Sequence, residues 1–236
     1  MKPVIRLNDV SLGWRDKPVL QHISGQFNQG TLTAILGANG AGKSTLVKGI
    51  INFIKPAAGS IDIAGPFRKE LTLLPQLSDL DRSFPITTYE LVAMGAWRRI
   101  GAWRQYGKVE RERINHALEK VGLLSAATRL IGELSGGQLQ RALFARMMVR
   151  DAQVLLLDEP FAAVDEQTCE DLMHIIQGWH KEGRTIIAVL HDVQRVRASF
   201  PETLLLARQL VAWGKTSEVL TEENLQRARR LSLGGF

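Results

Sequence analysis

The feature that most constrains this chain is a glycine-rich string, GANGAGKST, over residues 37–45. It fits the pattern G-x-x-x-x-G-K-[ST], and it follows an apolar stretch, residues 31–36, that we expect to be a strand. A helix is expected from Lys43 to about Ile54, ended before Pro56. In this setting the glycines let successive backbone N–H groups point inward, and the helix N-terminus adds to their attraction for phosphate. The string therefore predicts a nucleotide-binding α/β core.

Within the string, Lys43 is expected to reach the β and γ phosphates and Ser44 to offer its hydroxyl to Mg2+. A glycine-rich turn that binds nothing is disfavoured, because the complete pattern occurs between an expected strand and an expected helix. The string alone leaves kinases, motor ATPases, GTPases and transport ATPases open. The residues assigned to nucleotide binding are Gly37, Ala38, Asn39, Gly40, Ala41, Gly42, Lys43, Ser44 and Thr45.

Two carboxylates follow a second apolar stretch, residues 154–157. Asp158 at the end of this expected strand can hold Mg2+, and Glu159 can accept a proton from an attacking water or orient it. A strand with a polar cap would explain the pair when taken alone. Beside a phosphate loop, the pair indicates hydrolysis of the nucleotide.

The segment Leu134-Ser135-Gly136-Gly137-Gln138 narrows the class further. Ser135 and Gln138 have the spacing of a capping box, so a helix is expected to begin here. A capped helix start with two glycines also exposes N–H groups to an anion, such as a γ-phosphate delivered from elsewhere.

With these motifs, the chain resembles the ATP-binding subunits of ABC transporters over essentially its whole length. In that family the LSGGQ segment of one subunit closes over the nucleotide of the other. The resemblance implies a head-to-tail homodimer with two ATP molecules, in which Ser135, Gly136, Gly137 and Gln138 complete the partner's site.

The same resemblance assigns further residues. Gln76 would touch Mg2+ and the attacking water, Asp165 would lie at the dimer interface, His191 would sense the γ-phosphate, and Trp14 would stack on adenine. ATP and Mg2+ are the implied cofactors. The implied catalytic residues are Glu159, His191, Gln76 and Lys43, and the implied Mg2+ ligands are Ser44, Gln76 and Asp158.

The fold class expected is α/β, with a P-loop (RecA-like) core, an N-terminal antiparallel β portion and an inserted α-helical subdomain. Strand patterns occur at residues 4–10, 19–27, 60–64, 185–190 and 204–207, and helical patterns dominate 80–150 and return at 169–180. We expect a single ABC ATPase domain over 1–236, with 1–79 and 151–236 as the core and 80–150 as the helical subdomain.

The setting expected is the cytoplasmic face of the inner membrane. No apolar run has the length needed to cross a bilayer, and residues 1–6 lack the pattern of a signal peptide. The resemblance then favours an importer, docked on integral-membrane permease subunits and served indirectly by a substrate-binding protein. The short distance from Lys43 to Leu134 disfavours chromosome-maintenance ATPases, and the single domain disfavours translation factors.

The transported substrate is predicted to be zinc or manganese. Residues 76–95, QLSDLDRSFPITTYELVAMG, and 158–165, DEPFAAVD, resemble that branch, although Ala163 replaces its usual glycine. A haem or iron-siderophore importer is the alternative. Partner subunits would hold the transported metal, because His22, His116, His174, His180, His191 and Cys169 lack the short paired spacings of a zinc site.

A net charge of +6 raises the question of a polyanionic partner. Aromatic and basic side chains alternate over residues 97–99 and 103–108. We expect this stretch to face the channel subunit and the anionic lipid surface. Alternatives are a solvated face or a soluble, nucleic-acid-associated regulatory ABC ATPase; no nucleic acid is expected. An ATP-binding scaffold without turnover is disfavoured by Lys43, Asp158, Glu159 and His191.

Overall fold

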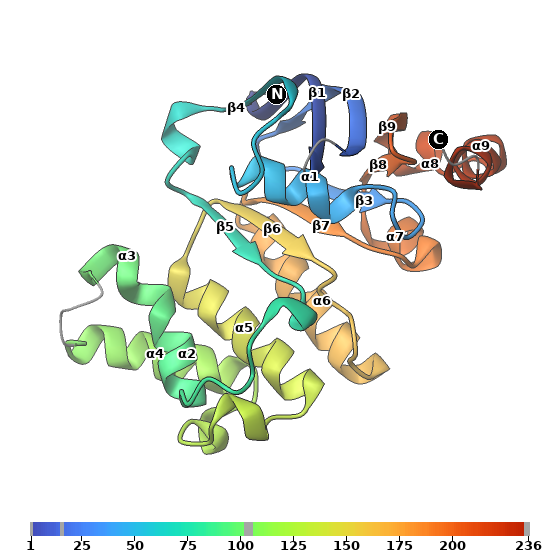
Figure 1. Ribbon diagram of the computed structural model, residues 1–236. Helices are drawn as coiled ribbons and strands as arrows, with labels where there is room; N and C mark the ends of the chain where they lie inside the picture. Colours follow the sequence, from blue (N-terminus) through green and yellow to red (C-terminus); the bar gives the residue numbers. More distant parts are fainter. Residues whose placement is uncertain (1, 15–16, 102–105, 234–236) are drawn as a thin grey trace. The chain divides into compact units, whose positions relative to one another are not determined.

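The computed structural model describes residues 2–14, 17–101 and 106–233, apart from the side chains of Trp14, Lys17 and Leu233, and divides into two compact units. Unit 1 comprises residues 1–73, 153–159 and 179–236, and unit 2 comprises 74–152 and 160–178 (Figure 1). The boundaries differ from those expected, because residues 74–79, 151–152 and 160–178 belong to the helical unit. Contacts explain the difference: within unit 2, Gln140 Nε2 donates to Pro160 O and Arg141 donates to Thr168 Oγ1.

The first sheet of unit 1 is antiparallel, in the order β2-β1-β4. Its strands are β1 (Pro3–Trp14), β2 (Lys17–Asn28) and β4 (Ala58–Ile63). Leu7 of β1 lies opposite Gly25 on one side and Ile61 on the other, and irregularities interrupt both registers. The expected N-terminal antiparallel portion is thus confirmed.

The second sheet has the order β5-β6-β7-β3-β8-β9. Its neighbours β6 (Val154–Asp158), β7 (Thr185–Val189), β3 (Leu32–Leu36) and β8 (Glu202–Leu206) are parallel, and β9 (Leu210–Lys215) is antiparallel to β8. Every residue of β3, β6 and β7 is buried, as expected for parallel strands covered on both faces. The sequence pattern gave no signal for β9 or for the four-residue β5 (Leu71–Leu74).

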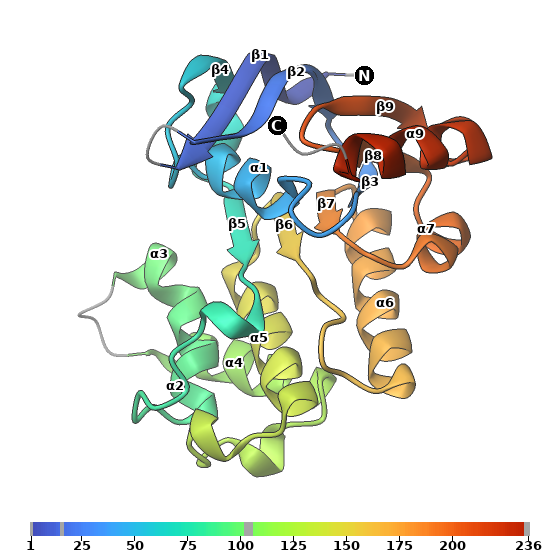
Figure 2. The same ribbon diagram turned by 45° about the vertical axis from the view of Figure 1, so that its right-hand side comes forward.

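Helix α1 (Lys43–Ile50) lies between the two sheets (Figures 1 and 2). Its buried Leu46, Val47 and Ile50 share one apolar cluster with residues of both sheets. The helix ends four residues before the expected Ile54. Asn52 takes a left-handed conformation with φ 59°, and the N–H groups of Phe53 and Ile54 both donate to Lys48 O, which closes the last turn well before Pro56.

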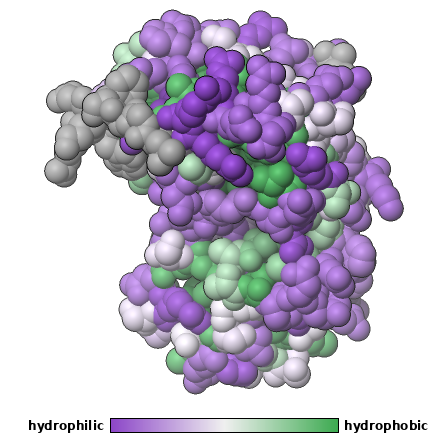
Figure 3. All heavy atoms as spheres, turned by 90° about the vertical axis from the view of Figure 1, so that its right-hand side faces the viewer, coloured by the Kyte–Doolittle hydropathy of each residue, from purple (hydrophilic) through white to green (hydrophobic). Residues whose placement is uncertain are grey.

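Three helices belong to the C-terminal part of unit 1. Helix α7 (Val193–Ser199) connects β7 to β8, and α8 (Thr216–Val219) and α9 (Glu222–Leu233) follow β9. Asp192 caps α7, because its carboxylate accepts from the N–H groups of Gln194 and Arg195. Figure 3 shows mostly hydrophilic residues on the face turned to the viewer, with hydrophobic ones visible between them.

Unit 2 is helical, as predicted for the insertion. It contains α2 (Thr88–Ala93), α3 (Trp97–Ile100), α4 (Lys108–Lys120), α5 (Gly136–Arg150) and most of α6 (Glu166–Lys181). Buried side chains of α2, α4 and α5 include Val92, Leu118 and Phe144. Among the described residues, no helix combines the length and the apolar character needed to cross a membrane.

We predict that Leu156→Ala in β6 lowers the free energy of unfolding by about 3 kcal/mol, because truncating a buried leucine leaves a cavity. Leu156 is fully buried in the apolar cluster of unit 1. Phe53→Ala is the matched control: its side chain is 69% exposed, so its loss should cost less than about 1 kcal/mol. Urea unfolding of both variants measures the difference, and equal costs would contradict the packing described.

Candidate active site

The phosphate loop joins β3 to α1 in unit 1. Gly40 and Gly42 have φ values of 77° and 93°, in the left-handed region that favours glycine. A Cβ on Gly42 would lie 2.5 Å from Leu20 of β2, so packing also excludes a side chain there. The sequence therefore forms the expected turn, with the backbone of residues 37–42 leading directly into the N-terminus of α1.

Lys43, the first residue of α1, folds back over the loop. Its Nζ donates to Gly37 O at 2.9 Å and to Ala38 O at 3.0 Å. Burial lowers the pKa of Lys43, and the nearby carboxylates of Glu159 and Asp158 act in the opposite direction. Lys43 as a whole residue is 5% exposed, so its side chain is held at the phosphate loop rather than in solvent. Arriving phosphate oxygens would supply further negative charge for it.

Ser44 and Asp158 lie next to each other, although they are far apart in sequence. Ser44 Oγ donates to Asp158 Oδ1 at 3.0 Å, and Asp158 is almost fully buried at the end of β6. A hydroxyl and a carboxylate are hard oxygen donors of the kind that Mg2+ takes alongside phosphate oxygens. The donor set at this point therefore fits the predicted magnesium ion.

Glu159 and His191 form a pair at the carboxyl ends of β6 and β7. His191 Nε2 donates to Glu159 Oε1 at 2.7 Å, and their side chains are 44% and 26% exposed, respectively. Glu159 has a left-handed φ of 53°, with its N–H bonded to Val189 O on β7. A carboxylate oriented by an imidazole and open to solvent is suited to accept a proton from water.

The LSGGQ segment lies in unit 2, at the start of α5. Ser135 Oγ accepts from Gln138 N–H at 3.2 Å, and Gln138 Oε1 accepts from Ser135 N–H at 3.1 Å. This is the capping box expected from the spacing. Gly136 packs closely on the segment around Ala163, since a Cβ added to Gly136 would lie 3.0 Å from Ala163 O.

Asp165 caps α6. Its carboxylate accepts from Thr168 N–H at 2.8 Å and from Thr168 Oγ1 at 2.9 Å, and these hydrogen bonds lower its pKa. Two residues earlier, Ala163 has a φ of 57°, which is strained for any residue with a Cβ. Alanine therefore replaces the usual glycine of the zinc and manganese branch at a position whose backbone conformation favours glycine.

Gln140 is a residue that the sequence analysis did not single out. It is 1% exposed on α5, and its Nε2 donates to Pro160 O at 2.7 Å, which ties the segment after Glu159 to the helix of the LSGGQ motif. A glutamine at this position of a helix has no local signature, because its acceptor lies 20 residues away in sequence.

The two remaining predicted site residues, Gln76 and Trp14, are not among the side chains that unit 1 is seen to bring together. Gln76 lies in unit 2, in extended conformation two residues after the end of β5, with Ser78 Oγ at 3.5 Å from its Oε1. Trp14 ends β1, but its side chain lies outside the described part of the chain. Unit 1 therefore brings together residues 37–45, Asp158, Glu159 and His191, and unit 2 carries Gln76, Ser135, Gly136, Gly137, Gln138 and Asp165.

The aromatic and basic stretch is described in part, because Trp103, Arg104 and Gln105 lie outside the described residues. Trp97 Nε1 donates to Tyr106 OH at 3.0 Å. Arg99 pairs with Glu110 at 2.8 Å, and this arginine lowers the pKa of the Glu110 carboxyl. Arg99 therefore pairs with a carboxylate within unit 2.

The family model described as ABC transporter matches residues 20–162, which include the phosphate loop, the LSGGQ segment and both carboxylates. The chain belongs to the ABC transporter family. A manganese transport system ATP-binding protein of Bacillus subtilis, MntB, is 39% identical over 94% of this chain and 91% of its own length. The zinc transport system ATP-binding protein TroB of Treponema pallidum is 39% identical over 95% and 86%.

Solved structures of ABC proteins share the fold of this chain. A chain of an ABC transporter described as of the metal-chelate type superposes with a TM-score of 0.85 at 25% identity, covering 97% of this chain and 90% of that one. The cbiO1 subunit of Clostridium perfringens gives a TM-score of 0.77 at 26% identity over 99% and 96%. This ABC chain is therefore an ATPase with the α/β fold of its family. Among its described residues, no group of three or more His, Cys, Asp or Glu side chains is placed to hold a metal.

We predict that Ala163→Gly stabilises this ABC subunit by about 0.5–1 kcal/mol, because glycine removes the steric cost of the left-handed backbone. Ala162→Gly is the matched control, since Ala162 has no positive φ and glycine only adds freedom to the unfolded chain. Chemical denaturation should thus move the two midpoints in opposite directions. A loss of stability in both variants would contradict the strain at residue 163.

Proposed function

We propose that this ABC subunit hydrolyses ATP at the site of unit 1 to energise an importer of zinc or manganese. The observation that carries the hydrolytic part is the Glu159–His191 pair, at the same edge of the sheet as Lys43, Ser44 and Asp158. The similarity to relatives named for manganese and zinc transport, over nearly the whole chain, supports the substrate.

Each side chain has a defined task in this proposal. The Lys43 ammonium and the N–H groups of the loop bind the β and γ phosphates. Glu159 accepts the proton of the attacking water, while the hydrogen bond from His191 Nε2 keeps its carboxylate in position. Trp14 would stack on adenine. Loss of the His191 bond would leave Glu159 present but less well oriented.

The Mg2+ ion would be held by Ser44 Oγ and Asp158, with Gln76 as a further ligand. When bound, it neutralises negative charge on the phosphate oxygens. The buried Asp158 carboxylate already attracts the Ser44 hydroxyl. This preorganisation holds both protein oxygens in place before an ion arrives.

The residues of unit 2 are proposed to act across a homodimer. Ser135, Gly136, Gly137 and Gln138 would offer the N-terminus of α5 to the ATP held by the partner, and Asp165 would lie at the interface. The capping box leaves this role open, because the Ser135 hydroxyl accepts one hydrogen bond and can still donate another. Two ATP molecules would then join two chains head to tail.

In this transport role the chain would lie at the cytoplasmic face of the inner membrane. Integral-membrane permease subunits would receive the movement of the dimer, and a substrate-binding protein would deliver the metal to them. Tighter binding of nucleotide in the closed dimer than in the open one would give the cycle its direction.

We predict that Glu159→Gln converts the protein to an ATP-dependent dimer. The amide keeps the shape of the side chain but cannot accept a proton, so ATP bound between two chains would persist. Size-exclusion chromatography with light scattering, with and without ATP and Mg2+, should give twice the monomer mass only when both are present.

The matched control is Lys43→Ala combined with Glu159→Gln, which should stay monomeric because the phosphates lose their ammonium partner. A Glu159→Gln chain that remains monomeric at saturating ATP and Mg2+ would overturn the sandwich. A dimer that forms equally in the double variant would show that association does not depend on the nucleotide.

The substrate is tested in cells whose own copy carries Glu159→Gln. We expect loss of uptake of one metal, zinc or manganese, when a chelator makes that metal scarce, and rescue of growth by adding it alone. Cell-associated metal, measured by mass spectrometry, is the readout.

The control strain carries Glu170→Gln on the exposed side of α6, which should take up both metals normally. Normal uptake of both metals by the Glu159→Gln strain, with the variant expressed and inactive as an ATPase, would overturn the metal assignment. Haem and iron-siderophore uptake would then be measured in the same strains.

A further inference from the structure

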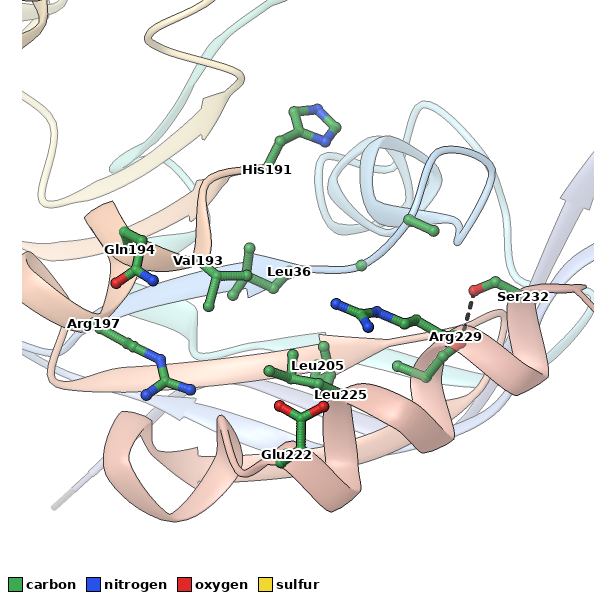
Figure 4. A pocket seen from close by; sticks show the side chains of 13 residues that line it. Leu36, His191, Val193, Gln194, Arg197, Leu205, Glu222, Leu225, Arg229 and Ser232 are labelled. Atoms are coloured by element: carbon green, nitrogen blue, oxygen red, sulfur yellow. Dashed lines mark hydrogen bonds between the residues drawn. The ribbon is translucent and has the colours of Figure 1, made fainter.

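Unit 1 contains a pocket that the hydrolytic mechanism does not use. It has a volume of about 450 Å³ and lies beside the start of the phosphate loop, bordered by β3, β8, α7 and α9 (Figure 4). Gly37, Ala38 and His191 form its border with the nucleotide site. Its size falls within the range of small-molecule sites.

The lining of the pocket divides into apolar and polar parts. Its apolar residues come from all four bordering elements: Leu36, Val193, Leu205, Leu225 and Ala228. Gln194, Arg197, Glu222, Arg229 and Ser232 add polar groups. A ligand that fills such a pocket needs an apolar body and at least one polar group.

The charges favour an anion. In Figure 4 the guanidinium groups of Arg197 and Arg229 lie on either side of Leu36 and Leu205, against a single carboxylate, that of Glu222. Glu222 Oε1 accepts from Gln226 Nε2 at 3.2 Å, and Arg197 donates to Leu220 O at 2.7 Å. The structure shows no hydrogen bond or ion pair from the Arg229 guanidinium to another described residue. Arg229 can therefore meet a ligand without first losing a protein partner.

We propose that this pocket binds a small amphipathic anion, with an apolar chain against Leu205 and Leu225 and a negatively charged head group at Arg229. The site adjoins the positions assigned to ATP and shares Gly37, Ala38 and His191 with them, but most of its lining comes from α7 and α9. It does not depend on which substrate the transporter carries.

The test uses three probes with the same eight-carbon chain: octyl phosphate, the neutral octanol and octylammonium, each below its micelle concentration. Methyl NMR spectra of the full chain, labelled at Leu and Val, report where each one binds. We expect saturable shifts of Val193, Leu205 and Leu225 with octyl phosphate, and weaker binding of the neutral and cationic probes.

Two charge reversals on α9 sharpen the test. Arg229→Glu should weaken octyl phosphate binding by about tenfold or more, because it places a negative charge beside the head group. Arg230→Glu changes the net charge equally but lies outside the pocket lining, so affinity should stay within about twofold.

Several results would overturn the proposal. They are equal or tighter binding of octylammonium, no saturable shift with octyl phosphate, equal effects of the two charge reversals, or shifts centred on Leu46 and Val47 of α1. The last would assign the probe to the nucleotide phosphate loop. None of these results bears on the Glu159→Gln dimer test, so the two proposals fail separately.

Discussion

The packing of α1 between two sheets is the constraint on which the rest of unit 1 depends. Leu46, Val47 and Ile50 are buried among side chains of both sheets, which fixes the axis of the helix. The N-terminus of α1 is therefore held at the end of β3, and the loop between them has little freedom. Gly42 can pass beneath Leu20 only because it lacks a Cβ. A phosphate site built in this way follows from apolar packing that lies behind it.

The same arrangement explains why chemistry gathers at one edge of the larger sheet. Parallel strands place their carboxyl ends together, so Asp158 at the end of β6 and His191 after β7 come close to the loop after β3. The left-handed backbone of Glu159 then turns its carboxylate to His191 Nε2. The strained backbone at Glu159 persists because β6 and β7 beside it are buried and regular.

Residues of unit 2 combine local structural roles with the roles proposed across a dimer. Ser135 and Gln138 cap α5, Asp165 caps α6, and Gln140 connects the two segments through Pro160. These contacts give the LSGGQ segment a defined conformation within a single chain. Binding of a partner's nucleotide would then require little further ordering, which lowers the entropic cost of closing the dimer.

The sequence by itself determined the phosphate loop, the Asp158–Glu159 pair and the capping box of Ser135, because each depends on residues adjacent in the chain or on a short turn. It also predicted β3, β6 and β7, whose continuous apolar runs require burial on both faces. Only the tertiary structure decided the place of β5 at the edge of the larger sheet, the hydrogen bond from Gln140 to Pro160 O and the pocket beside α9. These features join residues far apart in sequence, and local patterns carry no information about which distant group will meet a side chain when the core packs.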